Sequence, residues 1–114
     1  MELKRRVIRG VAIVDASGEI DMNSSPKLRS ECQKMFKQKD PKVLLNFTAV
    51  EYIDSSCIAT LIECMEEMEK YKGRMAIFGT QRATRVAFEI ARMDKIFKFY
   101  DTEGEALKAI GAAD

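Results

Sequence analysis

Apolar residues follow two different spacings along this chain, and segments with the two spacings alternate. Short apolar runs typical of strands are found at residues 11–14, 43–47, 75–78 and 96–100. The run at 43–47 is almost continuous, as in a strand covered on both faces. A segment of mixed polarity at residues 2–8 meets the first run at Arg9 and Gly10, which predicts an N-terminal hairpin. Gly18 is predicted to end the second strand.

Between these runs, apolar residues recur every three or four positions, which is the spacing of a helix that buries one face. Ser25 followed by Pro26 predicts the start of the first helix, and Thr102 with Glu105 predicts a capping box before the last. Thr80 is predicted to cap the third helix. The predicted buried faces are Leu28, Cys32, Met35 and Phe36; Ile58, Leu61, Ile62, Met65 and Met68; Ala83, Val86, Ala87 and Ile90; and Ala106, Leu107 and Ile110.

The order of elements is strand, strand, helix, strand, helix, strand, helix, strand, helix. Strands that alternate with helices require parallel pairs joined by crossover connections. The sequence therefore predicts an α/β fold with a mixed sheet of about five strands and about four helices. In that sheet the N-terminal hairpin is antiparallel and the remainder largely parallel. The length of 114 residues fits a single domain over residues 1–114.

The charges are balanced, with 19 Lys and Arg against 18 Asp and Glu, so no net field attracts nucleic acid. No apolar run approaches the roughly 18 residues that a membrane-spanning helix needs, so direct membrane insertion is not expected. Arg9 and Asp15 interrupt the apolar stretch behind the basic start, which argues against a signal peptide. We expect a cytoplasmic protein.

The sequence contains no histidine, which removes the usual base of serine and cysteine nucleophiles and most zinc sites. Three cysteines without a CxxC pair argue against a disulfide framework. We expect no metal, no cofactor and no enzymatic activity. A hydrolase with Ser56 as nucleophile is the weakest hypothesis, because it lacks a suitable base.

The polar stretch Asp54-Ser55-Ser56 separates the third strand from the second helix, at the carboxyl end of the predicted sheet. Asp54 or Ser55 can cap that helix, which is worth about 1 kcal/mol. Capping needs only one short polar residue, so Ser56 is left in the first turn with a hydroxyl predicted to face solvent. A phosphate there would meet a favourable helix N-terminus and the repulsive carboxylate of Asp54.

Four segments of the chain resemble the STAS domains of bacterial anti-sigma factor antagonists. They are Gly18-Glu19-Ile20-Asp21, the strand, loop and Asp-Ser-Ser signature at residues 43–56, the segment 73–79 and the segment 93–97. The resemblance covers nearly the whole chain in the same order of elements. It implies the STAS fold.

The resemblance also implies a partner-switching function. The unphosphorylated protein would bind an anti-sigma factor of the GHKL serine-kinase type and so release a sigma factor. The kinase would then phosphorylate Ser56, with Ser55 as the second candidate, and a PP2C-type phosphatase would reverse the modification. The residues that the resemblance assigns to the partner surface are Asp21, Asn23, Ser24, Asp54, Ser55 and Cys57.

The chain departs from the family pattern at three positions, where Cys57 replaces a glycine, Ile58 a leucine and Asn46 an aspartate. Cys57 would add a side chain to the surface offered to a kinase. A thiol at a helix N-terminus also allows a redox role, although free cysteines more commonly pack as small apolar residues. The alternative function is a STAS subunit without a switch, in a stress-sensing complex or on an ABC-type lipid transporter.

Overall fold

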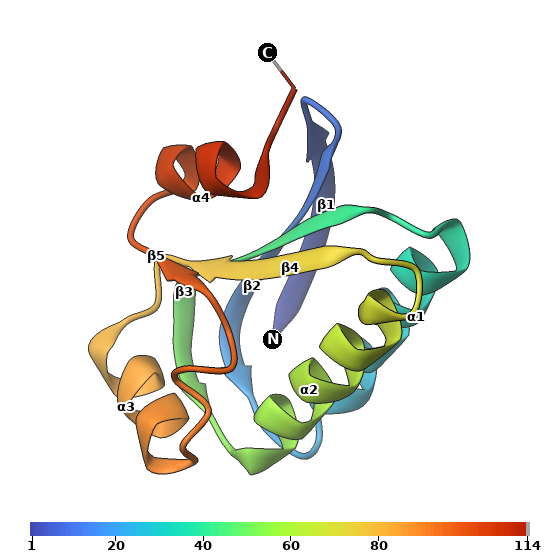
Figure 1. Cartoon of the computed structure of the whole chain (residues 1–114). Helices are drawn as coiled ribbons and strands as arrows, with labels where there is room; N and C mark the ends of the chain where they lie inside the picture. The colour runs from blue at the N-terminus through green and yellow to red at the C-terminus, as the bar shows by residue number, and fades with distance from the viewer. Residues whose placement is uncertain (114) are drawn as a thin grey trace.

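The computed structural model describes residues 1–113 and consists of one twisted sheet with helices on both faces (Figure 1). The strands are β1 (Glu2–Ile8), β2 (Val11–Ile20), β3 (Lys42–Ile53), β4 (Arg74–Phe78) and β5 (Phe99–Tyr100). They lie side by side in the order in which they occur in the chain. The β1–β2 pair is antiparallel and the other three pairs are parallel. The predicted α/β class and mixed sheet are therefore confirmed.

Helices connect the parallel strands, as crossover connections require. They are α1 (Ser25–Gln38), α2 (Ser55–Glu69), α3 (Arg82–Ile90) and α4 (Glu103–Ile110). The first three helices pack on one face of the sheet, and α4 packs alone on the opposite face (Figure 1). Thr102 accepts a hydrogen bond from the Glu105 N–H at 3.2 Å and so caps α4 as predicted.

The alternation of side chains along the strands divides the core into two parts. Val14 and Leu45 face α1 and α2, whereas their neighbours Ile13 and Leu44 face α4, and all four are almost fully buried. Because both faces of the central strands are covered, these strands consist of nearly continuous apolar residues.

Three strand boundaries differ from the prediction. Strand β2 continues through Gly18 to Ile20, since the positive φ of +85° at Gly18 accompanies register shifts against β3 instead of ending the strand. Strand β3 continues to Ile53, so the segment before Asp54 is strand and not loop. Only Phe99–Tyr100 of the last apolar run pair with β4, because residues 91–98 form turns.

The buried face predicted for α3 was wrong. Phe88 and Thr84 are the buried residues of this helix, whereas Val86 is exposed and Ile90 is 78% exposed. Phe88 packs against a cluster of aromatic rings from β3 and the segment around β5. A large aromatic residue gains more from burial than the smaller residues of the alternative face, which sets the rotation of the helix.

The edge strand β1 is tied to α4 by a polar cluster outside the two cores. The Arg6 guanidinium donates to both carboxylate oxygens of Asp15, at 2.7 and 3.0 Å, and to Glu103. Asn46 also donates to Asp15, at 2.8 Å. The hydrogen bond from Arg6 first, then that from Asn46 and the charge of Arg6, hold the pKa of Asp15 below its usual value against the opposing effect of burial.

Candidate functional site

The predicted signature lies where β2 and β3 end side by side. Ile20 and Ile53, the last residues of these strands, are in register, and the Asp54 N–H donates to the Ile20 carbonyl at 3.2 Å. Helices α1 and α2 both start from this edge, so their amino ends lie next to each other (Figure 1). Two sets of helix N–H dipoles therefore converge on one small region of the surface.

Asp54 is the N-cap of α2 and the centre of the site. Its Oδ1 accepts from the Ser56 N–H at 2.9 Å and from the Ser56 hydroxyl. Its Oδ2 accepts from the Met22 N–H at 3.1 Å, which ties the β2–α1 loop to the start of α2. These hydrogen bonds, led by the Ser56 hydroxyl, hold the pKa of Asp54 below its usual value.

The Ser56 hydroxyl is half-buried between α1 and α2, and it is not the fully exposed group that the sequence predicted. Besides its bond to Asp54, its Oγ lies 2.6 Å from the Oγ of Ser25, which in turn lies 2.7 Å from the Asp21 carbonyl. These three contacts share only two hydroxyl hydrogens. The Asp54 carboxylate and the Asp21 carbonyl can only accept, so Ser56 and Ser25 cannot satisfy all three contacts with their own hydrogens at once.

The β2–α1 loop contains the other predicted partner residues. Asp21 Oδ1 accepts from the N–H groups of Asn23 and Ser24, at 2.9 and 3.1 Å, and from the Ser24 hydroxyl at 3.2 Å. The Ser24 Oγ also accepts from the Asp21 N–H at 2.9 Å. Asp21 and Ser24 thus stabilise this turn from within, and the exposed surface comes from Asn23 and Met22.

The two neighbours of Ser56 differ in exposure. Ser55 is exposed, and its hydroxyl has no hydrogen bond within residues 1–113. Cys57 is 0% exposed and belongs to the core, which corrects its predicted place on the partner surface. Burial raises the pKa of the Cys57 thiol, so a redox role as a thiolate is disfavoured.

Sequence reasoning missed two parts of this region. The sequence predicts only a capping role for Ser25, whereas its side chain is buried against Ser56. An exposed apolar rim was also missed: Met22 is 75% exposed and Ile90 78%. A shallow groove next to this rim is lined by Ile53, Asp54, Ser55, Ile58, Ala87, Ile90 and Ala91. The apolar character of Ile90 is visible in the sequence, but its helical spacing predicted a buried residue and not an exposed one.

The chemistry available here is that of a hydroxyl with acceptors around it. Asp54 is the carboxylate at Ser56, and a carboxylate with a lowered pKa is a poor base at neutral pH. Within residues 1–113 no group of three His, Cys, Asp or Glu side chains could hold a metal ion. None of the helices in the described part of the chain combines the length and apolar character needed to cross a membrane.

Comparison with protein families gives a match to the STAS domain over residues 2–106. An anti-sigma F factor antagonist from Paenibacillus polymyxa is 25% identical over 100 residues, which are 87% of this chain and 86% of the relative. The match extends over both chains almost from end to end.

Solved structures share the fold of this chain. An anti-sigma factor antagonist from Mycobacterium paratuberculosis superposes with a TM-score of 0.87 and 28% identity, covering 96% of this chain and 92% of the other. The Bacillus cell-fate determinant SpoIIAA in its phosphorylated form gives a TM-score of 0.73 at 21% identity, covering 96% and 99%. A sulfate transporter family protein from Wolinella succinogenes shares the fold at 18% identity, with a TM-score of 0.79, covering 92% and 88%.

Proposed function

Because the chain belongs to the STAS domain family, we propose that it is an anti-sigma factor antagonist switched by phosphorylation of Ser56. In the unphosphorylated state it binds an anti-sigma factor that is also a GHKL-type serine kinase, and a sigma factor is released. Phosphorylation of Ser56 weakens that complex, and a PP2C-type phosphatase restores it. The domain acts as a binding partner and a substrate, not as a catalyst.

The observation that carries this proposal is the position of the Ser56 hydroxyl at the junction of two helix amino ends. A phosphoryl group on Ser56 brings about −1.5 to −2 charges and three strong acceptors. The N–H dipoles of α1 and α2 favour that charge, and the Ser25 hydroxyl is within reach as a donor. The junction can therefore accept a phosphate without unfolding.

The Asp54 carboxylate opposes a phosphate on Ser56. Phosphorylation removes the hydrogen that Ser56 donates to Asp54 and places two anions next to each other. Asp54 also binds the Met22 N–H, so displacement of its carboxylate would reach the β2–α1 loop. The modification thereby changes both segments of the proposed partner surface at once, which is the behaviour that a partner switch requires.

The exposed apolar rim supports the binding half of the proposal. Ile90 lines the groove beside Asp54 and Ser55, and Met22 adjoins the same site through its N–H bond to Asp54. Both side chains are largely exposed, and apolar groups that are exposed together commonly mark a protein interface. Charge added at Ser56 would lie at the edge of this rim. The polar site and the apolar rim together resemble an interface with a polar switch at its border.

The proposal is tested by incubating the protein and ATP with each GHKL-type serine kinase of the source organism, followed by phosphopeptide mass spectrometry. We expect one phosphate on Ser56, absent from Ser56→Ala and retained in Ser55→Ala. The phosphorylated protein should lose affinity for the kinase in a pull-down. A phosphate on Ser55, or none with any kinase, would contradict the switch. A large native assembly without phosphorylation would favour the STAS subunit without a switch.

A further inference from the structure

Strand β4 has an open edge at its amino-terminal half. Its parallel partner β5 pairs only with Ile77 and Phe78, so residues 74–76 have no strand on that side. Open strand edges in native proteins are usually short or guarded by charge, because they can pair with another chain. This edge is short, and Arg74 stands at its start.

The hydrogen-bonding groups at this edge belong to Met75. The N–H groups of Ile77 and Gly79 donate to carbonyls around β5, at 2.9 and 3.0 Å, whereas the N–H of Arg74 points to the other side and donates to Pro41 at 2.8 Å. Backbone groups alternate in direction along a strand, so the Met75 N–H and C=O face the open side. Within residues 1–113 they have no backbone partner there.

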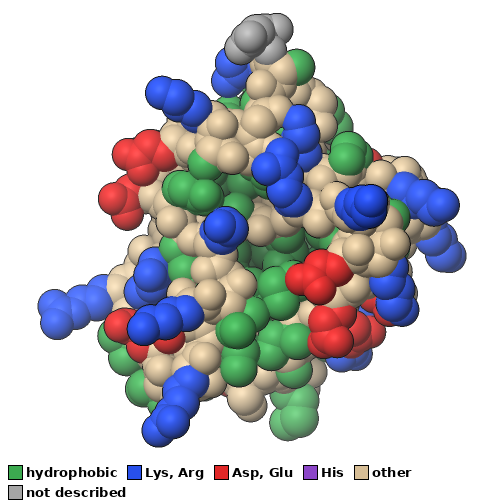
Figure 2. Space-filling model, in the orientation of Figure 1, with side chains coloured by type: hydrophobic (Ala, Val, Ile, Leu, Met, Phe, Trp, Pro, Cys, Tyr) green, Lys and Arg blue, Asp and Glu red, His purple; other side chains and the backbone are tan. Residues whose placement is uncertain are grey.

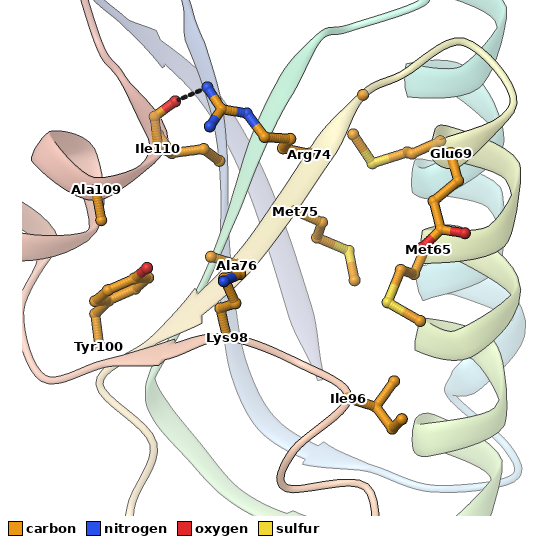
Figure 3. A pocket seen from close by; sticks show the side chains of 12 residues that line it. Met65, Glu69, Arg74, Met75, Ala76, Ile96, Lys98, Tyr100, Ala109 and Ile110 are labelled. Atoms are coloured by element: carbon orange, nitrogen blue, oxygen red, sulfur yellow. Dashed lines mark hydrogen bonds between the residues drawn. The ribbon is translucent and has the colours of Figure 1, made fainter.

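A groove runs along this edge, between α2 on one side and α4 with the segment before β5 on the other (Figure 3). Its volume is about 280 Å³, slightly below the roughly 300 Å³ at which small-molecule pockets begin. Its walls are mostly apolar, with Met65, Met68, Met75, Ala76, Ile96, Ala109 and Ile110 among them. The space suits one or two inserted side chains better than a cofactor, and methionines adapt readily to different shapes.

Basic and acidic side chains lie on different sides of the groove. Figure 2 shows an apolar hollow with basic side chains towards α4 and acidic ones towards α2. Arg74 is anchored by donating to the Ile110 carbonyl at 2.6 Å, and Lys98 is exposed on the segment before β5 (Figure 3). Glu69 is the acidic residue of the lining. Neither Lys98 nor Glu69 has an ion pair within the described residues, so both charges are available to a ligand.

From these features we infer that the β4 edge binds an extended peptide segment of a partner protein, by strand addition. The peptide pairs with the N–H and C=O of Met75 and inserts an apolar side chain between α2 and α4. An acidic residue beside that side chain meets Lys98 and Arg74. Backbone pairing gives the affinity, and the groove with its two cations gives the selectivity.

This site is separate from the one at Ser56. Met65, the groove residue on α2 nearest to the signature, follows Ser56 by nine positions, which is about 13 Å along a helix. The peptide site therefore does not depend on the proposed phosphorylation switch, and either can fail without the other.

The inference is tested by selecting a random-peptide phage library against the full chain and measuring the affinity of the enriched peptides. We expect peptides in which an apolar residue neighbours Asp or Glu. NMR spectra should show the largest shifts at the Met75 and Ala76 amides, with no shift at Ser56. Ala109→Phe, which fills the groove from an exposed position, should weaken binding by about tenfold or more.

Ala83→Phe is the matched control, because Ala83 is also exposed but lies on α3, away from the groove. The peptides should bind this variant as they bind the unmodified chain. Lys98→Glu tests the charge without filling the groove, and it should weaken the acidic peptides. Enriched peptides that bind Ala109→Phe normally, or no enrichment at all, would overturn the inference. So would a dimer in size-exclusion chromatography that Ala109→Phe dissociates, because the edge would then bind a second copy.

Discussion

The hydroxyls of Ser55 and Ser56 are adjacent in the sequence but have different surroundings. The Ser55 hydroxyl is exposed and makes no hydrogen bond within residues 1–113, while the Ser56 hydroxyl contacts Asp54 and Ser25. The sequence predicted a cap at Asp54 or Ser55, because short polar residues before a helical pattern commonly cap, and the structure assigns the cap to Asp54. It could not predict the contact with Ser25, since that contact depends on how α1 and α2 pack.

Replacing Ser56 by alanine should raise the pKa of Asp54. The Ser56 hydroxyl is the leading cause that keeps this pKa below its usual value, and Ser56→Ala removes it while leaving the backbone N–H bonds. The measurement is an NMR titration of the Asp54 carboxyl carbon. Ser55→Ala is the control and should leave the titration unchanged. Equal Asp54 titrations in Ser56→Ala and the unmodified chain would contradict the hydrogen bond.

The same lowered pKa has a consequence for stability against pH. A carboxyl whose pKa is lower in the folded state stabilises the fold above its unfolded pKa of roughly 3.9. That contribution is lost as the pH falls through the folded pKa. The difference in free energy of unfolding between the unmodified chain and Ser56→Ala should therefore shrink on acidification below about pH 4, as measured by urea denaturation. A difference that grew in acid would contradict this sign.

For helices and strands, the sequence predicts the positions, whereas tertiary packing decides which face of a helix is buried. Helix and strand positions could be predicted because apolar spacing reports burial directly, and the parallel order followed from their alternation. The rotation of α3 could not be predicted in this way, because Ile90 and Phe88 belong to two alternative apolar faces, each with helical spacing. The choice depends on the aromatic cluster that Phe88 forms with Phe97, Phe99 and the sequence-distant Phe47 of β3.

Two substitutions in α3 test its rotation. Phe88→Ala removes a fully buried ring and should lower the free energy of unfolding by about 3–5 kcal/mol. Ile90→Ala changes a residue that is 78% exposed and should change it by no more than about 0.5 kcal/mol. Chemical denaturation of both variants gives the comparison. The reverse order of effects would restore the face predicted from the sequence.

Substitutions at two glycines should change stability in opposite directions, one in the turn after β4 and one in the first turn of α4. At Gly79, φ is +76° and an added Cβ would lie 2.3 Å from the Thr48 Oγ1, so Gly79→Ala should destabilise by more than about 1 kcal/mol. Gly104 is in α4 with nothing within 4 Å of an added Cβ, so Gly104→Ala should stabilise by about 0.4–1 kcal/mol. Thermal unfolding distinguishes the two signs. A stabilising Gly79→Ala would show that the turn is not fixed.

At the scale of the whole molecule, the two proposed binding surfaces lie at different ends of α2. The Ser56 region lies at the amino end of that helix, and the groove lies along its later turns. The family resemblance predicted the first surface and gave no indication of the second. The groove exists because the last apolar run forms a strand of only two residues, and spacing alone predicted five.

Effects at the two surfaces should be additive. Ser56→Glu and Ala109→Phe change residues in separate sites, since Ala109 lines the groove and Ser56 does not. The stability change of the double variant should therefore equal the sum of the single changes within about 0.5 kcal/mol. Urea unfolding of the three variants measures it. A larger deviation would mean that α2 transmits a change between its two ends.

The order of the strands also has a consequence for folding. Each strand pairs with the strand that precedes it in the chain, so no strand has to enter between two that are already paired. The sheet can grow from β1 to β5 by closing one connection between consecutive strands at a time, so no step has to close a loop longer than one crossover. Arg6 and Glu103, which are 97 positions apart, meet only when α4 docks. Their contact therefore reports the docking of α4 on the β1 side of the sheet.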